Sequence, residues 1–317
     1  MLWALKRVAV SLVLVWVVAS IVFLAIRFVP GDPAELLLAQ QGGAAPSPAA
    51  VAALHHQLGL DRPISTQYVG EMRALLHGDL GNSLQDDSPV INEITDRLPR
   101  TLELIVAATL IAILLGVPAG LFAALRPGRG FDRLASTFAA TGLAVPIFVV
   151  GTLFVLVFAQ TLHWLPAGGY VSFSDSPLRH VETVLMPALT IALGLFATVF
   201  RMTRVAVIDV NRRDFVRTAR AKGAPRCRVL LRHVLRNALM PVVTIVALNF
   251  GSLLGGTVLV EYVFNYPGLS GLLVDAVNAR DYPEVQGVIL VISVLFVTLN
   301  LLVDLLYGVL DPRVRGA

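Results

Sequence analysis

Long stretches without a charged side chain dominate this sequence. Five of them run over residues 8–26, 104–125, 183–200, 237–260 and 285–303. A helix needs roughly 20 apolar residues to cross about 30 Å of hydrocarbon, so each stretch is long enough for one membrane crossing. With 56% hydrophobic and only 15% charged residues, the composition does not fit a soluble, disordered or fibrous chain of 317 residues.

A sixth uncharged stretch covers residues 134–174 and is too long for one crossing. It is interrupted at 163–169, where His-Trp-Leu-Pro-Ala-Gly-Gly is typical of an exit loop with an interfacial tryptophan. We therefore expect one span near 134–160, and six in all. Lys6 and Arg7 precede the first span as in a signal peptide, but its apolar run is longer than the usual 7–15 residues, so a retained helix is expected.

Basic residues set the orientation of the spans. With the N-terminus in the cytoplasm, eighteen of the 25 Lys and Arg residues fall on the inner side, and eleven of these lie between Arg201 and Arg236. Most acidic residues then face outward. Because cytoplasmic loops carry an excess of Lys and Arg, this asymmetry predicts that both termini are cytoplasmic.

The segment 30–100 is the only sizeable external piece. It opens with the turn sequence Pro-Gly-Asp-Pro at 30–33. Helix-start and helix-end residues predict one short helix from Ser47-Pro48 to Gly59, a second over 66–77, and a third starting at Ser88-Pro89. We interpret the segment as a lid on the membrane part, which is compatible with contact to a delivery protein.

These observations divide the chain into three parts. Residues 1–29 hold the N-terminal tail and the first span, 30–100 form the external helical region, and 101–317 form a five-helix core that includes the cytoplasmic loop 201–236.

Prolines and glycines inside the spans mark possible irregularities. Prolines at 118, 146, 187 and 241 can each kink a helix. In the fifth span, glycines at 251, 255 and 256 permit close helix packing or line a pathway, and packing is the preferred interpretation.

A short amphipathic helix is predicted between the last two spans. Pro267 can start it, and Leu269, Leu272, Leu273 and Ala276 then share one face. Such an element at the outer surface could act as a gate or as a structural plug, and the sequence favours neither. The gate candidates are Tyr266, Pro267, Gly268, Leu269 and Leu272.

The cytoplasmic loop between the fourth and fifth spans carries the most specific pattern. Its first part, 214–222, favours helix; Gly223 ends that helix and Pro225 starts the next. By itself the loop could be a positively charged segment that only orients the protein. A nucleic-acid site is a poor alternative, because the loop lacks interleaved aromatic residues and the chain is confined to a membrane.

This loop resembles a known family. Arg-Thr-Ala-Arg-Ala-Lys-Gly at 217–223 is similar to the EAA-type loop of ABC importer permeases, and more narrowly to the dipeptide/oligopeptide group. The resemblance extends over nearly the whole chain. Its other blocks are Pro-Gly-Asp-Pro at 30–33, Leu-Gly-Leu-Asp-Arg-Pro at 58–63, His-Gly-Asp-Leu-Gly at 77–81, Tyr-Pro-Gly-Leu at 266–269, Ala-Arg-Asp-Tyr-Pro at 279–283 and Leu-Asp-Pro-Arg-Val-Arg at 310–315. Arg217 and Thr218 stand where the general pattern has Glu and Ala, which argues against a sugar-type permease.

The resemblance implies a type I ABC importer permease, an all-α protein of the bacterial inner membrane with six spans. It implies that the loop docks on a separate ATPase subunit. The coupling residues would be Asp214, Phe215, Arg217, Thr218, Ala219, Arg220, Ala221, Lys222, Gly223 and Ala224. The implied partners are a second homologous permease, one or two ABC ATPases that bind ATP and Mg, an extracytoplasmic solute-binding protein and the lipid bilayer.

Several other classes fit the sequence poorly. The only lysines, Lys6 and Lys222, do not follow a glycine, so there is no Walker A motif and ATP hydrolysis is expected in partner subunits. The sole cysteine, Cys227, excludes an internal disulfide and a thiolate metal cluster, and neither a metal site nor a catalytic residue is expected. An ion-coupled transporter is the alternative of another class, but the middle of each span lacks ionisable residues. The sequence does not choose among dipeptides, oligopeptides, nickel complexes and glutathione as the solute.

Overall fold

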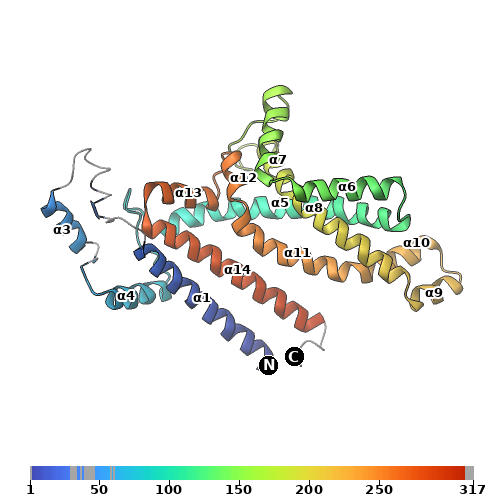
Figure 1. The fold of residues 1–317 in the computed structure, drawn as a ribbon, viewed down its shortest axis with the longest axis horizontal. Helices are drawn as coiled ribbons and strands as arrows, with labels where there is room; N and C mark the ends of the chain where they lie inside the picture. Colours follow the sequence, from blue (N-terminus) through green and yellow to red (C-terminus); the bar gives the residue numbers. More distant parts are fainter. Residues whose placement is uncertain are drawn as a thin grey trace. The chain divides into compact units, whose positions relative to one another are not determined.

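The computed structural model describes residues 2–28, 34–35, 38, 47–57, 59 and 61–310. These residues form helices joined by turns, and the described part contains no β-strand beyond one isolated bridge. Figure 1 shows the arrangement. The helices are α1 Leu2–Phe28, α3 Pro48–Gln57, α4 Ile64–Leu76, α5 Val90–Leu125, α6 Gly130–Ala144, α7 Ile147–Phe154, the π-helical turn η1 Val155–Thr161, α8 Pro177–Asn211, α9 Asp214–Ala221, α10 Arg226–Arg228, the π-helical turn η2 Val229–Leu235, α11 Arg236–Gly256, α12 Val258–Val263, α13 Leu269–Ala279 and α14 Tyr282–Leu310.

Five helical segments in the described residues are long and apolar enough to cross a membrane, or up to six when one bent pair is counted as a single span. The bent pair is where the sequence predicts one span near 134–160, with a proline at 146 that can kink it. There, α6 and the α7–η1 segment meet at 103°. Val145 and Pro146 adopt extended backbone angles between them. Proline lacks a backbone N–H and disfavours helix at the preceding residue, which accounts for the break.

The external helices follow the start and stop residues of the sequence. α3 begins at Pro48 and α4 covers nearly the expected segment. The third external helix, however, does not stand alone. It continues without a break into the second span as the 36-residue helix α5. The turn at 30–33 lies wholly outside the described residues. The block at 310–315 lies outside them except for its first residue.

The described residues group into two compact units. The first contains residues 1–99 and 271–317. In it α1 packs along α14, and Arg7 and Asp304 form an ion pair of 2.8 Å near their cytoplasmic ends. Near the opposite end of α14, the fully buried Asp281 accepts hydrogen bonds from the Ser83 hydroxyl and from the Leu84 backbone N–H. These bonds fix the segment before α5 to the start of α14.

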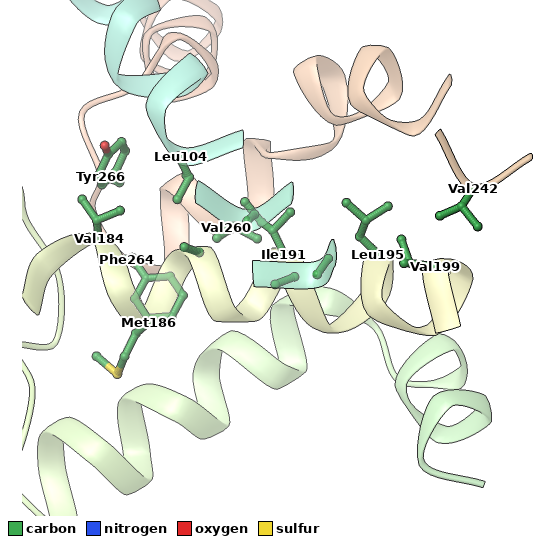
Figure 2. Packing of buried hydrophobic residues seen from close by; sticks show 14 residues of the cluster. Leu104, Val184, Met186, Ile191, Leu195, Val199, Val242, Val260, Phe264 and Tyr266 are labelled. Atoms are coloured by element: carbon green, nitrogen blue, oxygen red, sulfur yellow. The ribbon is translucent and has the colours of Figure 1, made fainter. Parts of the chain in front are cut away.

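The second unit, residues 100–270, is built around α8. Figure 2 shows the buried apolar side chains of α8 meeting those of its neighbours. Leu104 of α5, Val242 of α11 and Val260 of α12 belong to this cluster, together with Ile191 and Leu195 of α8. Because α8 contributes the most members, it is the helix on which the others are assembled.

Two glycines let α5 approach α8 closely. A methyl group on Gly116 would lie 2.9 Å from Val199 Cγ1, and one on Gly120 would lie 2.7 Å from the Phe200 carbonyl oxygen. The glycines that the sequence suggested for packing are elsewhere, in the fifth span. Gly255 and Gly256 are exposed, and a methyl group on either would meet nothing within 4 Å. The packing interpretation is therefore wrong for these two within this chain.

Candidate functional site

The loop between α8 and α11 folds into a helical elbow, which we define as residues 211–225. α8 ends at Asn211 and α9 starts three residues later. Gly223 then adopts a left-handed conformation, with φ of +78°, which glycine reaches without steric cost. Pro225 occupies the N-cap position of the next helix. The helix–turn–helix that Gly223 and Pro225 predict is thus confirmed.

The elbow is anchored by a single buried side chain. Val216 of α9 is completely buried and contacts an apolar cluster that we call the elbow cluster. The cluster joins α5, α8, η2 and α11, and its buried members are Leu121, Ala124, Ala206, Val207, Val210, Val216, Val229, Val234 and Ala238. Burying a valine side chain contributes about 1.5–3 kcal/mol, so Val216 favours the docked position of α9.

Hydrogen bonds reinforce the turn on both sides of α9. Arg220 donates to the side-chain oxygen of Asn211, which ties the end of α9 back to the end of α8. The Ala224 N–H donates to the Ala219 carbonyl at 3.2 Å, which closes the helix C-terminus across Gly223. The first bond ties α9 to the end of α8, and the second closes the C-terminus of α9 within the elbow.

The outward face of α9 consists of small and charged residues. Residues three and four apart share a helix face, so Asp214, Thr218 and Ala221 lie together opposite Val216. All three are exposed, as are the flanking Phe215 and Arg217. Of the remaining predicted coupling residues, Arg220, Lys222 and Gly223 are exposed, whereas Ala219 and Ala224 are half-buried and pack against the elbow cluster.

A buried ion pair supports α8 before the elbow. Asp132 of α6 is almost fully buried, and its two carboxylate oxygens accept hydrogen bonds from Nε and Nη2 of Arg204 at 2.6 and 2.9 Å. The same carboxylate accepts the Gly128 N–H at 2.7 Å. A two-pronged pair of this kind fixes orientation as well as distance, so it holds the turn before α6 against α8.

The second candidate region lies on the external side of the membrane, because the excess of Lys and Arg places the elbow on the cytoplasmic side. It is centred on Glu261 of α12, which is 1% exposed. The Glu261 carboxylate accepts hydrogen bonds from the hydroxyls of Thr101 and Thr257 and from the Ser270 N–H, at 2.9, 3.2 and 2.9 Å. A methyl group on Gly268 would overlap the same carboxylate. We call these five residues the external knot.

Tyr266 extends the external knot into an aromatic and charged cluster. Its hydroxyl donates to the Arg100 carbonyl at 3.3 Å, and its ring meets the ring of Tyr170 edge to face. Burial raises the pKa of Tyr266 well above its usual value, and the carboxylate of Glu103 adds to the rise. Glu103 is itself held by Nε2 of His180 at 2.6 Å. The tyrosine is thus a neutral, fixed part of the packing.

The gate candidates are therefore packed side chains. Tyr266, Gly268, Leu269 and Leu272 are buried, and Pro267 is half-buried. The amphipathic pattern of α13 is confirmed, since Ala276 is buried on the same face. Their role as a gate remains a prediction.

Sequence reasoning missed the residues that hold these regions in place. Val216 was not among the coupling candidates, although an apolar residue three positions before Ala219 on a short polar helix indicates an inward anchor. Glu261 looked like an ordinary charge near a span end. In the described part of the chain, no three His, Cys, Asp or Glu side chains come together as metal ligands would.

An all-helical chain with these apolar spans and a short helical elbow between two of them has the architecture of a membrane permease. Residues 116–316 match the family described as binding-protein-dependent transport system inner membrane component, and residues 1–105 match the N-terminal family of the same membrane components. The chain belongs to this family. It is thus a multi-pass protein of the bacterial inner membrane that works in an ABC transport system, and its family is one of permeases and not of enzymes.

Named relatives agree with this assignment, and a solved structure shares the fold. The glutathione transport system permease protein GsiC of Salmonella typhimurium is 40% identical over 99% of this chain and 98% of its own length. A putative peptide transport system permease protein of Brucella melitensis is 42% identical over 98% of each chain. The fold is similar to that of a crystallised amino acid ABC transporter with histidines, with a TM-score of 0.53 and 15% identity over 68% of this chain and 93% of that one.

Proposed function

We propose that this chain forms half of a translocation path for small peptides and is driven by separate ATPase subunits through the elbow. The observation that carries the proposal is the two-sided construction of α9. One side is buried in the elbow cluster, and the other presents Thr218 and Ala221 to the cytoplasm between charged neighbours. A helix with this division is suited to insertion into a groove on a partner.

The physical route of coupling follows from the anchoring. A force on α9 reaches α8, η2 and α11 through the elbow cluster, because Val216 belongs to one apolar cluster with buried residues of all three. Close-packed interiors transmit displacement and do not absorb it. ATP-driven closure of the ATPases would therefore tilt these helices as a group and switch the path between inward-facing and outward-facing states.

The partners follow from the same scheme. A path between two membrane chains requires a second homologous permease, and the family's name refers to a binding protein that supplies the solute outside the membrane. One or two ABC ATPases would bind ATP and Mg. Arg217 and Lys222 are exposed on the elbow and can pair with acidic side chains of such a subunit.

Contact between α9 and the ATPase can be tested by photo-crosslinking. A benzophenone amino acid at Thr218, which points outward, is expected to form an adduct with the ATPase in the assembled complex. The same amino acid at Arg129, which is exposed in the other cytoplasmic turn, is the control and is expected to give little adduct. Adducts detected by immunoblot in equal amounts from both positions, or from Arg129 alone, would show that α9 is not the docking element.

The solute class is proposed from the relatives, whose printed names refer to peptides and to glutathione, itself a tripeptide. We expect a deletion strain to lose uptake of radiolabelled di- or tripeptides, glutathione among them, and to regain it with the intact gene. The measurement is initial uptake with and without an excess of unlabelled competitor. Unchanged peptide and glutathione uptake, with loss of uptake of an unrelated solute, would contradict the peptide proposal and leave the permease assignment intact.

A further inference from the structure

The external helix α4 has an exposed apolar face that the packing of its unit leaves uncovered. Val69 is 64% exposed and Leu76 is 86% exposed. At 100° per residue these two side chains lie within about 20° of each other on the helix, with the partly exposed Met72 beside them. A third exposed apolar residue, Ile64, belongs to the first turn and lies off this face.

The contacts between α4 and α1 show how deep α4 lies in the membrane, measured along α1. Tyr68 shares a hydrogen bond of 2.7 Å with the Ser20 hydroxyl, and its ring meets the Phe23 ring at 5.4 Å between centroids. The charge-free part of α1 runs over residues 8–26, so Ser20 lies roughly 9 Å inward of its outer end at 1.5 Å per residue. Tyr68 therefore reaches below the outer boundary of the hydrocarbon, and Figure 1 shows α4 beside the outer half of α1.

A second set of contacts fixes the height of the other side of α4. Arg27 donates from Nε to the Gln67 side-chain oxygen at 3.1 Å and pairs with Glu71 at 3.8 Å. Glu71 also accepts a hydrogen bond from Gln286, in the first turns of α14. Arg27 is one residue from the outer end of the apolar part of α1, so this side of α4 lies at the level of the lipid headgroups.

The two heights define which way α4 is rotated. Gln67 and Glu71 contact Arg27, near the outer end of α1, whereas Tyr68, about 60° or more farther around α4, contacts Ser20, which is deeper in the membrane. Continuing in the same sense by about 80–100° leads to Leu76 and Val69. Their face is therefore directed inward and away from α1, toward the acyl chains. Thr66 and Gly70 lie about 60° and 100° farther around the helix from Val69 in the same sense, turned progressively outward, and both are exposed.

The chemistry of the neighbouring residues fits the same place. Tyrosine is enriched at membrane–water interfaces, where its ring is in the apolar layer and its hydroxyl finds a polar partner. Arg73 is exposed next to Val69 and Leu76, and a long arginine side chain can reach the phosphate level from an apolar position. Burial within the protein raises the pKa of Glu71, and the nearby Arg27 opposes this shift.

We infer that α4 is an interfacial membrane helix, with Val69, Met72 and Leu76 inserted into the outer leaflet of the bilayer. The partner of this surface is lipid and not a protein. An amphipathic helix in this position binds the boundary between headgroups and acyl chains through its buried apolar area. It fixes the start of the external region to the membrane surface, independently of the solute or of the ATPase.

The test uses single-cysteine variants of the complete transport assembly. Because the chain has one cysteine, Cys227→Ser provides the background. Val69→Cys and Leu76→Cys carry an environment-sensitive fluorophore, and Thr66→Cys and Gly70→Cys are matched controls on the outward side of the same helix. The assemblies are placed in nanodiscs of phosphatidylethanolamine and phosphatidylglycerol, with either ordinary or brominated acyl chains, and iodide is the aqueous quencher.

Brominated lipids are expected to quench the labels at 69 and 76 several-fold more than those at 66 and 70, and iodide is expected to show the reverse order. Equal quenching at all four positions would overturn the inference. Protection of 69 and 76 from iodide only after the binding protein is added would identify a protein-docking face instead. If the labels at 69 and 76 are protected from iodide in ordinary nanodiscs but are not quenched by brominated lipid, the face contacts the second permease. This result too would overturn the inference.

Discussion

Gly223→Arg is expected to leave membrane insertion intact and to lower solute uptake by at least about tenfold. Gly223 adopts a φ of +78°, which costs a residue with a side chain roughly 1–2 kcal/mol. The site is open, since a methyl group there would meet nothing within 4 Å, so the arginine side chain projects into the space where the ATPase is proposed to dock. Uptake is measured at equal permease abundance in the membrane, beside ATPase co-purification.

Gly128→Arg is the matched control for this prediction. Gly128 has the same φ of +78° and the same open surroundings, and it lies in the other cytoplasmic turn, between α5 and α6. Both variants therefore carry the same backbone strain and the same added charge. Uptake should fall only with the change at Gly223. Equal losses would show that strain or charge, and not docking at the elbow, is responsible, and normal uptake by the Gly223 variant would refute the docking role.

Gly120→Val is expected to reduce the abundance and the thermal stability of the permease strongly. The first added carbon would lie 2.7 Å from the Phe200 carbonyl oxygen and 3.1 Å from the Arg204 backbone nitrogen. Backbone atoms of a packed helix cannot rotate away, so α5 and α8 must separate along their contact. Overpacking of this kind costs typically 1–3 kcal/mol. The measurement is the midpoint of thermal unfolding in detergent, together with membrane abundance at a fixed expression level.

Gly194→Val provides the comparison. Gly194 lies within α8, where a methyl group would meet nothing within 4 Å, so the same replacement tests the general effect of valine in a membrane helix without the clash. Its unfolding midpoint should stay near that of the unmodified chain. If both variants unfold alike, the close approach of α5 and α8 at Gly120 has no energetic importance.

The spans and the elbow could be predicted because local residues decide them. A charge-free run of about 20 residues has few options other than a membrane helix. Gly223 and Pro225 restrict the backbone directly, so the end of one helix and the start of the next follow from residue types alone. The same holds for α13, whose apolar spacing identified its buried face.

Packing decides the features that the sequence left open. Pro146 and Pro187 both lie in apolar surroundings, yet only Pro146 interrupts its span. Pro118 and Pro241 also lie inside unbroken helices, α5 and α11, although Pro118 is exposed like Pro146. Neither the residue type nor the exposure of the proline therefore tells which span breaks. Glycines pose the same problem. Residue type does not reveal that Gly120 meets another backbone and that Gly255 meets none.

The candidate site shows the same division. The sequence located the elbow but did not distinguish its two sides, so Ala219, half-buried in the elbow cluster, was grouped with the exposed Ala221. That distinction depends on α8 and η2, which lie on either side of α9 in the chain and meet it only in three dimensions. The external knot depends on partners still farther apart in the sequence.

The external knot also sets an order for synthesis and folding, because its partners are far apart in the sequence. Thr101 enters the membrane with the second span, but its acceptor, Glu261, is synthesised 160 residues later. The hydrogen bonds of the knot can therefore close only after the fifth span has left the ribosome. Until then the hydroxyl of Thr101 is at the edge of an apolar environment without its acceptor, the carboxylate of Glu261. A chain truncated before Glu261 would lack this acceptor, and the Thr101 hydroxyl would have to find another partner.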